Sequence, residues 1–156
     1  LDRKSVVAIA NRLDNIDSSS DVFPTTDYVL PTDPDGDNNE VIYCTRKVTL
    51  KTPANSIKTY LDAVKFDSSE IQVMYKILRS DDASDFDEIG WEYFNTNGLP
   101  DTTVNASVDN NDFIEREYTV EGLQEFISFA IKIRMQGTNS SEPPRVKDLR
   151  AIALAT

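Results

Sequence analysis

Short stretches in which apolar and polar side chains alternate are the dominant pattern of this 156-residue chain. The longest stretch covers residues 127–136, where odd positions are Ile, Phe or Met and even positions are small or polar. A period of two residues places one set of side chains on each face of a β-strand. We therefore predict a strand whose odd-numbered face lies in the core, namely Ile127, Phe129, Ile131, Ile133 and Met135.

The same alternation, together with β-branched and aromatic residues, predicts further strands over residues 5–10, 41–50, 56–66, 71–78, 113–120 and 149–155. The strand over residues 41–50 is expected to be bulged near Arg46, and the sequence TPAN is expected to form the turn after it. Only the sequence DSSE separates residues 56–66 from residues 71–78, so these two runs are the best hairpin candidate. Small and aliphatic residues on both faces of the last run suggest a strand covered on both sides.

Polar segments rich in turn-forming residues separate the predicted strands. Residues 14–40, which contain Pro24, Pro31 and Pro34, form a long irregular excursion, and residues 80–90 form an acidic loop. Residues 120–126 are too few for a stable helix, so we expect one helical turn or a loop. The chain is therefore predicted to be all-β, an antiparallel β-sandwich with long irregular N-terminal loops.

The length fits a single domain, residues 1–156. The chain begins LDRKSVV, with Leu1 in place of an initiator Met and without the basic and apolar sections of a signal peptide. We therefore expect a domain excised from a longer polypeptide.

Charge and composition narrow the functional classes. The 27 acidic residues outnumber the 16 basic ones, giving a net charge of -11, and an acidic surface repels phosphate backbones. We expect no nucleic acid partner and, since the longest apolar run is short, no membrane insertion. The chain has no His, the commonest general base and transition-metal ligand. We predict no catalytic residues and a non-enzymatic role, and we expect the single Cys44 to be a small buried apolar residue.

An acidic run, DPDGDNNE, raises the question of calcium. Asp33, Asp35 and Asp37 alternate in a way that lets their carboxylates converge on a hard cation. An EF-hand loop, however, requires Gly where this chain has Asn38 and Glu where it has Cys44. The same run also fits a solvated turn that binds no ion, so both interpretations stay open.

Aromatic residues gather in a second candidate site. Trp91 and Tyr93 share one face of an extended segment, where they could form a platform for a sugar ring. A carbohydrate-binding module is therefore the alternative function. Large aromatic residues in an all-β chain more often pack in the core, and the same spacing predicts that outcome equally well.

Charged residues provide two further candidates. Paired carboxylates such as Glu115 with Glu117 could in principle serve a glycosidase, but in so acidic a chain most pairs are a solvated surface. A basic patch near the end of the chain could contact an acidic neighbour in an assembly or this domain's own acidic loops. It consists of Arg145, Lys147 and Arg150.

Five segments, which together span most of the chain, carry a family resemblance: residues 1–17, 46–63, 71–82, 86–98 and 117–154. They resemble a domain of large virion structural proteins, of the baseplate or tail type, in contractile-tailed phages of marine bacteria, including cyanophage-like myophages. The resemblance implies a jelly-roll-like sandwich within a larger subunit that is assembled in the host cytoplasm and located in the virion. It implies other virion proteins or copies of itself as partners, and no catalytic or cofactor residue is carried over from it. In this setting the alternative is a carbohydrate-binding module on a virion, or on a secreted enzyme, that binds a host-surface glycan.

Overall fold

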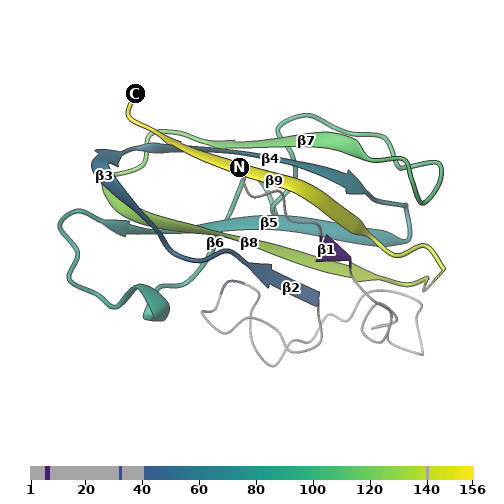
Figure 1. Ribbon diagram of the computed structural model, residues 1–156, viewed down its shortest axis with the longest axis horizontal. Coiled ribbons are helices and arrows are strands. Elements are labelled where there is room, and N and C mark those ends of the chain that lie inside the picture. Colours follow the sequence, from purple (N-terminus) through teal and green to yellow (C-terminus); the bar gives the residue numbers. More distant parts are fainter. Residues whose placement is uncertain (1–5, 8–31, 33–40, 140) are drawn as a thin grey trace.

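The computed structural model describes residues 6–7, 32, 41–139 and 141–156. These residues form two antiparallel sheets that pack face to face in two layers (Figure 1). The predicted all-β antiparallel sandwich is therefore confirmed, while the jelly-roll-like connectivity stays a prediction. The expected irregular N-terminal loops lie outside the described residues, apart from Thr32.

We call the first layer the β4 sheet, with the strand order β1-β9-β4-β7. Its strands are β1 (Val6–Val7), β9 (Arg145–Leu154), β4 (Ser56–Val64) and β7 (Ile114–Val120). The second layer is the β8 sheet, with the order β2-β8-β5-β6 and with β3 also paired to β8. Its strands are β2 (Val41–Cys44), β3 (Val48–Ala54), β5 (Ser69–Arg79), β6 (Glu92–Tyr93) and β8 (Phe126–Gly137).

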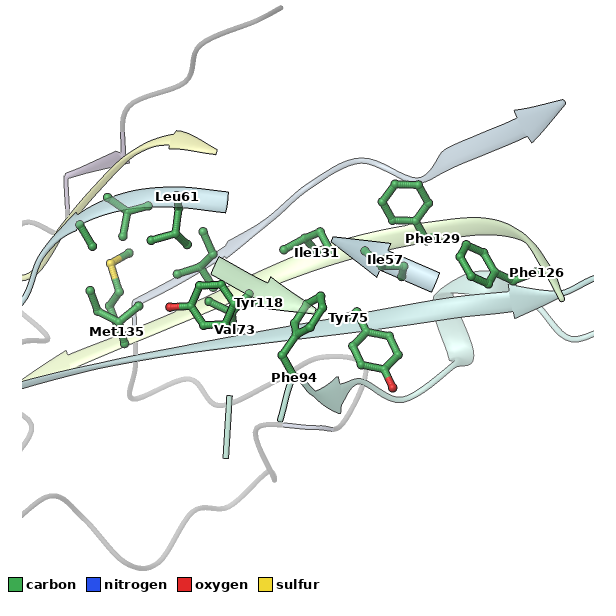
Figure 2. Close-up of a cluster of buried hydrophobic side chains, with 14 of the residues drawn as sticks. Ile57, Leu61, Val73, Tyr75, Phe94, Tyr118, Phe126, Phe129, Ile131 and Met135 are labelled. Atoms are coloured by element: carbon green, nitrogen blue, oxygen red, sulfur yellow. The ribbon is translucent and has the colours of Figure 1, made fainter. Parts of the chain in front are cut away.

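The main core lies between the sheets and contains inward-facing side chains from both (Figure 2). Phe129, Ile131, Ile133 and Met135 are buried in it, which confirms the prediction for that face of β8. Ile127 is not part of this core, contrary to expectation, and Phe126 takes its place with no exposed surface. The physical reason is a register shift between β5 and β8, which pairs Leu78 with Ser128 but Arg79 with Phe126.

The outer face of the β8 sheet carries a second, smaller apolar cluster. It lies against the 3-10 helix η1 (Phe86–Glu88) and consists of Met74, Phe86, Trp91 and Ala130. The even positions of β8 are therefore buried as well, including Lys132 with 1% of its surface exposed. Long Lys side chains can cover apolar surface with their methylene groups, so alternation alone does not indicate how far this face is covered.

The predicted hairpin between residues 56–66 and 71–78 is wrong. The first run forms β4, which pairs with β7 and β9, whereas the second forms β5, which pairs with β8 and β6. The connection crosses from one sheet to the other through a tight turn, in which the Ser69 amide donates to the Phe66 carbonyl at 3.1 Å. Strands that stack face to face bury alternate residues just as hairpin strands do, so the pattern did not distinguish the two arrangements.

The predicted irregularity near Arg46 is confirmed, because β2 and β3 are two pieces of one broken edge strand along β8. Thr45 bridges the break: its amide donates to the Ile131 carbonyl and its hydroxyl accepts from the Ile131 amide, both at 2.9 Å. The expected TPAN turn is shorter than predicted, since β3 continues through Pro53 to Ala54 and only Asn55 precedes β4. Pro53 is compatible with β3 because an edge strand leaves some amide positions unpaired.

Strand β9 differs from the expected closing strand in two ways. It begins at Arg145 rather than Leu149, and it contains a bulge at Asp148, whose φ is 53°. The bulge lets Val146 and Leu149 both face the core although they are three residues apart. The expectation that β9 is covered on both sides is wrong, because Ile152 and Leu154 on its outer face are 48% and 42% exposed.

Candidate functional site

The structure describes the Cys44 thiol but not the three candidate metal ligands. Asp33, Asp35 and Asp37 lie outside the described residues. Within the described ranges, no group of three or more His, Cys, Asp or Glu residues is placed to hold a metal ion. Cys44 is exposed at the end of β2, so the expected burial of this residue is wrong. Desolvation by the surrounding protein nevertheless raises the pKa of its thiol, against the lowering effect of Lys132 and Lys76.

Trp91 and Tyr93 lie on the same side of the β8 sheet, as their spacing predicted, but Trp91 is only 5% exposed. Its ring packs in the outer cluster, with Lys76 Nζ 4.8 Å and Lys132 Nζ 5.5 Å from the ring centroid. A sugar stacks on an exposed aromatic face, and this Trp ring does not offer one. The packing interpretation accounts for Trp91, and the glycan platform does not.

Lys76 joins this cluster to the helix beside it. Its ammonium lies 4.4 Å from the Phe86 ring centroid and donates to the Phe86 carbonyl oxygen at 2.9 Å. Burial lowers the pKa of Lys76, while Asp87, Cys44 and Asp85 act in the opposite direction. These contacts hold the acidic loop, residues 80–90, against the sheet.

The basic patch makes contacts within its own domain. Arg145 Nη1 donates to the Asn110 carbonyl at 3.2 Å, and Lys147 Nζ lies 4.1 Å from the Phe113 ring centroid. Arg150 forms a salt bridge with Glu115, with 2.9 Å between Nη2 and Oε2. This partner belongs to strand β7 rather than to an acidic loop. The three side chains thus interact with residues of their own domain at the outer face of the β4 sheet. These contacts give no indication of a partner protein.

Asp62 lies among these charges and gives a prediction with a defined pH dependence. Burial raises its pKa, Asp148 and Glu115 raise it further, and Arg150 and Lys147 oppose the effect. The folded state therefore holds the Asp62 proton more tightly than the unfolded state. Stability is lost as the pH rises from 3.8, the pKa of the Asp62 carboxyl in the unfolded chain, through its raised pKa in the folded protein. Asp62→Asn removes this loss and should stabilise the protein at pH 7 by less than about 1 kcal/mol.

Urea unfolding of wild type and Asp62→Asn at pH 7 and pH 4 measures this effect. The stabilisation should shrink at pH 4, because the wild-type carboxyl is then partly protonated. Glu121→Gln, which removes one acidic charge from an exposed loop, controls for the change in net charge. An equal gain at both pH values, or an equal gain in the control, would contradict the assignment.

A groove at one side of the sandwich was not anticipated from the sequence. It lies between the broken edge strand β2–β3 of the β8 sheet and strand β9 of the β4 sheet, and its volume is about 340 Å³. Its lining combines apolar residues from both sheets with one cation at the rim: Tyr43, Thr45, Arg46, Val48, Phe129, Ile131, Leu149 and Ala151. The break at residues 45–47, which the sequence did indicate, is what opens this side.

Among the residues that the structure describes, strand β9 has an unpaired edge beside the groove. In the described part of the chain, β1 pairs with β9 only at Arg145 and Val146, so β9 from Leu149 onward is paired on one side, with β4. Exposed apolar residues accompany this edge, namely Ile152, Leu154 and, across the groove, Val48 with 42% of its surface exposed. An unpaired strand edge with exposed apolar side chains is a template for adding another strand.

The opposite edge of the same sheet, strand β7, is closed by Asp101. The Asp101 amide donates to the Glu117 carbonyl at 2.8 Å, and its carboxylate accepts from the Thr119 amide at 2.8 Å and hydroxyl at 2.6 Å. Backbone groups that could pair with another chain are thereby occupied on β7. The contrast between the two edges makes the groove and the β9 edge, which together we call the open side, the candidate interaction surface.

No protein-family model, no curated protein and no solved structure matches the chain. Over the ranges that the structure describes, no helix is both long and apolar enough to cross a membrane. The fold is an antiparallel β-sandwich, and the open side is a surface feature that both of its sheets form.

Proposed function

We propose that this chain is a non-enzymatic structural and interaction domain of a phage virion protein, in the tail or baseplate region. The resemblance of five segments to such proteins supports the virion context, and the all-β sandwich is compatible with it. The observation that carries the interaction role is the open side, where an apolar groove adjoins the edge of β9 that no described residue pairs beyond Val146. The contact is made with a neighbouring subunit in the particle.

The partner segment is an extended strand of another virion protein. Such a strand pairs with the backbone of β9 and places alternate side chains in the groove, so backbone hydrogen bonds and apolar burial act together. Burying an exposed aliphatic side chain such as Ile152 contributes about 1.5–3 kcal/mol at most. Contacts of this kind hold a subunit in an assembly without any chemistry at the site.

Charge favours a different protein over a second copy. Each copy carries a net charge of -11, so two copies repel one another. The rim of the groove carries a positive charge, because the exposed Arg46 is part of its lining. An incoming strand that combines apolar and acidic side chains matches this rim.

Ile152→Asp in the full-length protein tests the proposal. The side chain is half exposed, so the fold should tolerate the change with a loss of less than about 1 kcal/mol. The carboxylate would lie on the outer face directly beside the added strand, where it replaces an apolar contact and loses part of its hydration. Incorporation into purified particles should therefore fall at least tenfold, as measured by quantitative mass spectrometry.

Val108→Asp is the matched control, because Val108 is 84% exposed and lies outside both the groove and strand β9. It should be incorporated like wild type. Normal incorporation of Ile152→Asp, or equal loss for both variants, would overturn the role of the open side. Absence of the wild-type chain from the particle fraction would overturn the virion assignment itself.

A further inference from the structure

A second cavity, of about 260 Å³, lies at the other side of the sandwich, beside strand β7. Residues from the ends of β4 and β5, from β7 and from the loop over residues 99–104 line it. They are Lys65, Ile71, Leu99, Pro100, Asp101, Thr103, Val104 and Arg116. Its walls are therefore partly apolar and partly cationic, which is the composition of a site for an organic anion.

Arg116 is the most unusual residue of this cavity. It occupies an inward-facing position of β7, one alternate position before the core residue Tyr118, and is only 4% exposed. Its Nε and Nη2 atoms are buried and have no hydrogen-bond partner within the described part of the chain. Burial lowers the pKa of Arg116, although a guanidinium stays charged at neutral pH. A buried charge without a counter-ion destabilises a fold unless something compensates it.

The other charged residues of the cavity do not compensate Arg116. Lys65 adds a second cation, whose Nζ donates to the Phe66 carbonyl at 3.2 Å and whose pKa is lowered by burial and by Arg116. Asp101 is the one acidic residue of the lining, and its carboxylate already accepts three hydrogen bonds, two from Thr119 and one from Asn95 Nδ2 at 2.8 Å. The cavity thus holds an excess of positive charge in a protein whose net charge is strongly negative.

We propose that this cavity binds a small organic carboxylate, with Arg116 and Lys65 as the cations that face the carboxylate group. A carboxylate matches the planar guanidinium, and a bound anion relieves the repulsion between the two cations. The apolar body of the ligand contacts Ile71, Leu99 and Val104. The site is independent of the proposed function, because it adjoins β7, at the opposite edge of the β4 sheet from the open side.

Benzoate and galacturonate are suitable probes because one carries an apolar ring and the other a sugar ring. At 10 mM, at least one of them should raise the melting temperature of the wild-type domain by about 2–4 °C relative to sodium chloride at equal ionic strength. In an NMR titration, the Arg116 Nε–Hε signal should shift and saturate. Arg116→Met should abolish the thermal shift and, without ligand, be as stable as wild type or more so, because an uncompensated buried charge is removed.

Lys51→Met removes an exposed cation outside the cavity and should retain the wild-type response. If Arg116→Met does not fold, Lys65→Gln serves in its place and should weaken the response at least threefold. The proposal is overturned if neither carboxylate shifts the wild type, or if Arg116→Met responds like wild type. An equal response to sulfate would overturn the assignment to organic carboxylates, because it would show an anion site that makes no use of the apolar walls.

Discussion

Phe94→Ala is expected to lower the free energy of unfolding by about 3–5 kcal/mol, a large fraction of the stability of a domain of this size. Phe94 has no exposed surface, and its ring lies between those of Tyr75 and Tyr118, with centroids 5.0 Å and 6.0 Å away (Figure 2). Truncation would leave a cavity between the sheets and remove both aromatic contacts. Urea unfolding followed by tyrosine and tryptophan fluorescence measures the change.

Leu99→Ala is the matched control, since Leu99 lies five residues further along the same irregular segment and is 46% exposed. Its truncation should cost less than about 1 kcal/mol. Similar losses for the two variants would mean that Phe94 does not occupy the core position described above.

Gly98→Ala is expected to destabilise the fold by about 2–4 kcal/mol, through steric overlap and backbone strain together. Gly98 has a φ of 73°, and an added Cβ would lie 2.8 Å from the Val73 amide nitrogen and 2.9 Å from the Val73 carbonyl oxygen. The close approach is required because the Val73 amide donates to the Gly98 carbonyl at 3.1 Å. The segment that follows β6 is therefore fixed to β5 by backbone contacts. Thermal unfolding of the variant measures the loss.

Gly122→Ala distinguishes the cost of backbone strain from the cost of steric overlap. Gly122 has a φ of 70°, but an added Cβ there would meet nothing within 4 Å. Its substitution should cost only the conformational strain, about 1 kcal/mol. If both alanine variants lost the same stability, the contact between Gly98 and β5 would have no energetic role.

The individual strands could be predicted from sequence because a period of two residues is a local property. The odd face of β8 and the irregularity near Arg46 both follow from such patterns. The pairing of strands could not be predicted in the same way. The residues of β4 and β5 alternate correctly for a hairpin, yet the two strands belong to different sheets, because their short connection passes across the sandwich.

The candidate sites were harder to predict because they depend on which faces are covered. Trp91 is buried by an acidic loop and by Lys side chains whose polar character suggested an exposed face. The sequence did contain a signal for the second cavity: in the run from Ile114 to Val120, a charged residue, Arg116, occupies the apolar row. A cation at an inward position indicates either a buried partner or a ligand.

The two surfaces lie at opposite edges of the β4 sheet and can act independently. The β7 edge, closed by Asp101, carries the cavity with Arg116. The β9 edge is free beyond β1 among the described residues and adjoins the groove. A strand docked on the open side would therefore leave the cavity accessible, and a ligand in the cavity would not block assembly.

Docking of a neighbouring virion protein on the open side is tested most directly by photo-cross-linking within assembled particles. A benzophenone amino acid replaces Ile152 in the full-length protein, and a second sample carries it at the exposed loop position Glu121. We predict that irradiation joins the Ile152 position to a specific extended segment of another virion protein, with little product from Glu121. Docking on the open side would be contradicted if the Ile152 position gave no cross-link in intact particles, or the same weak mixture of products as Glu121.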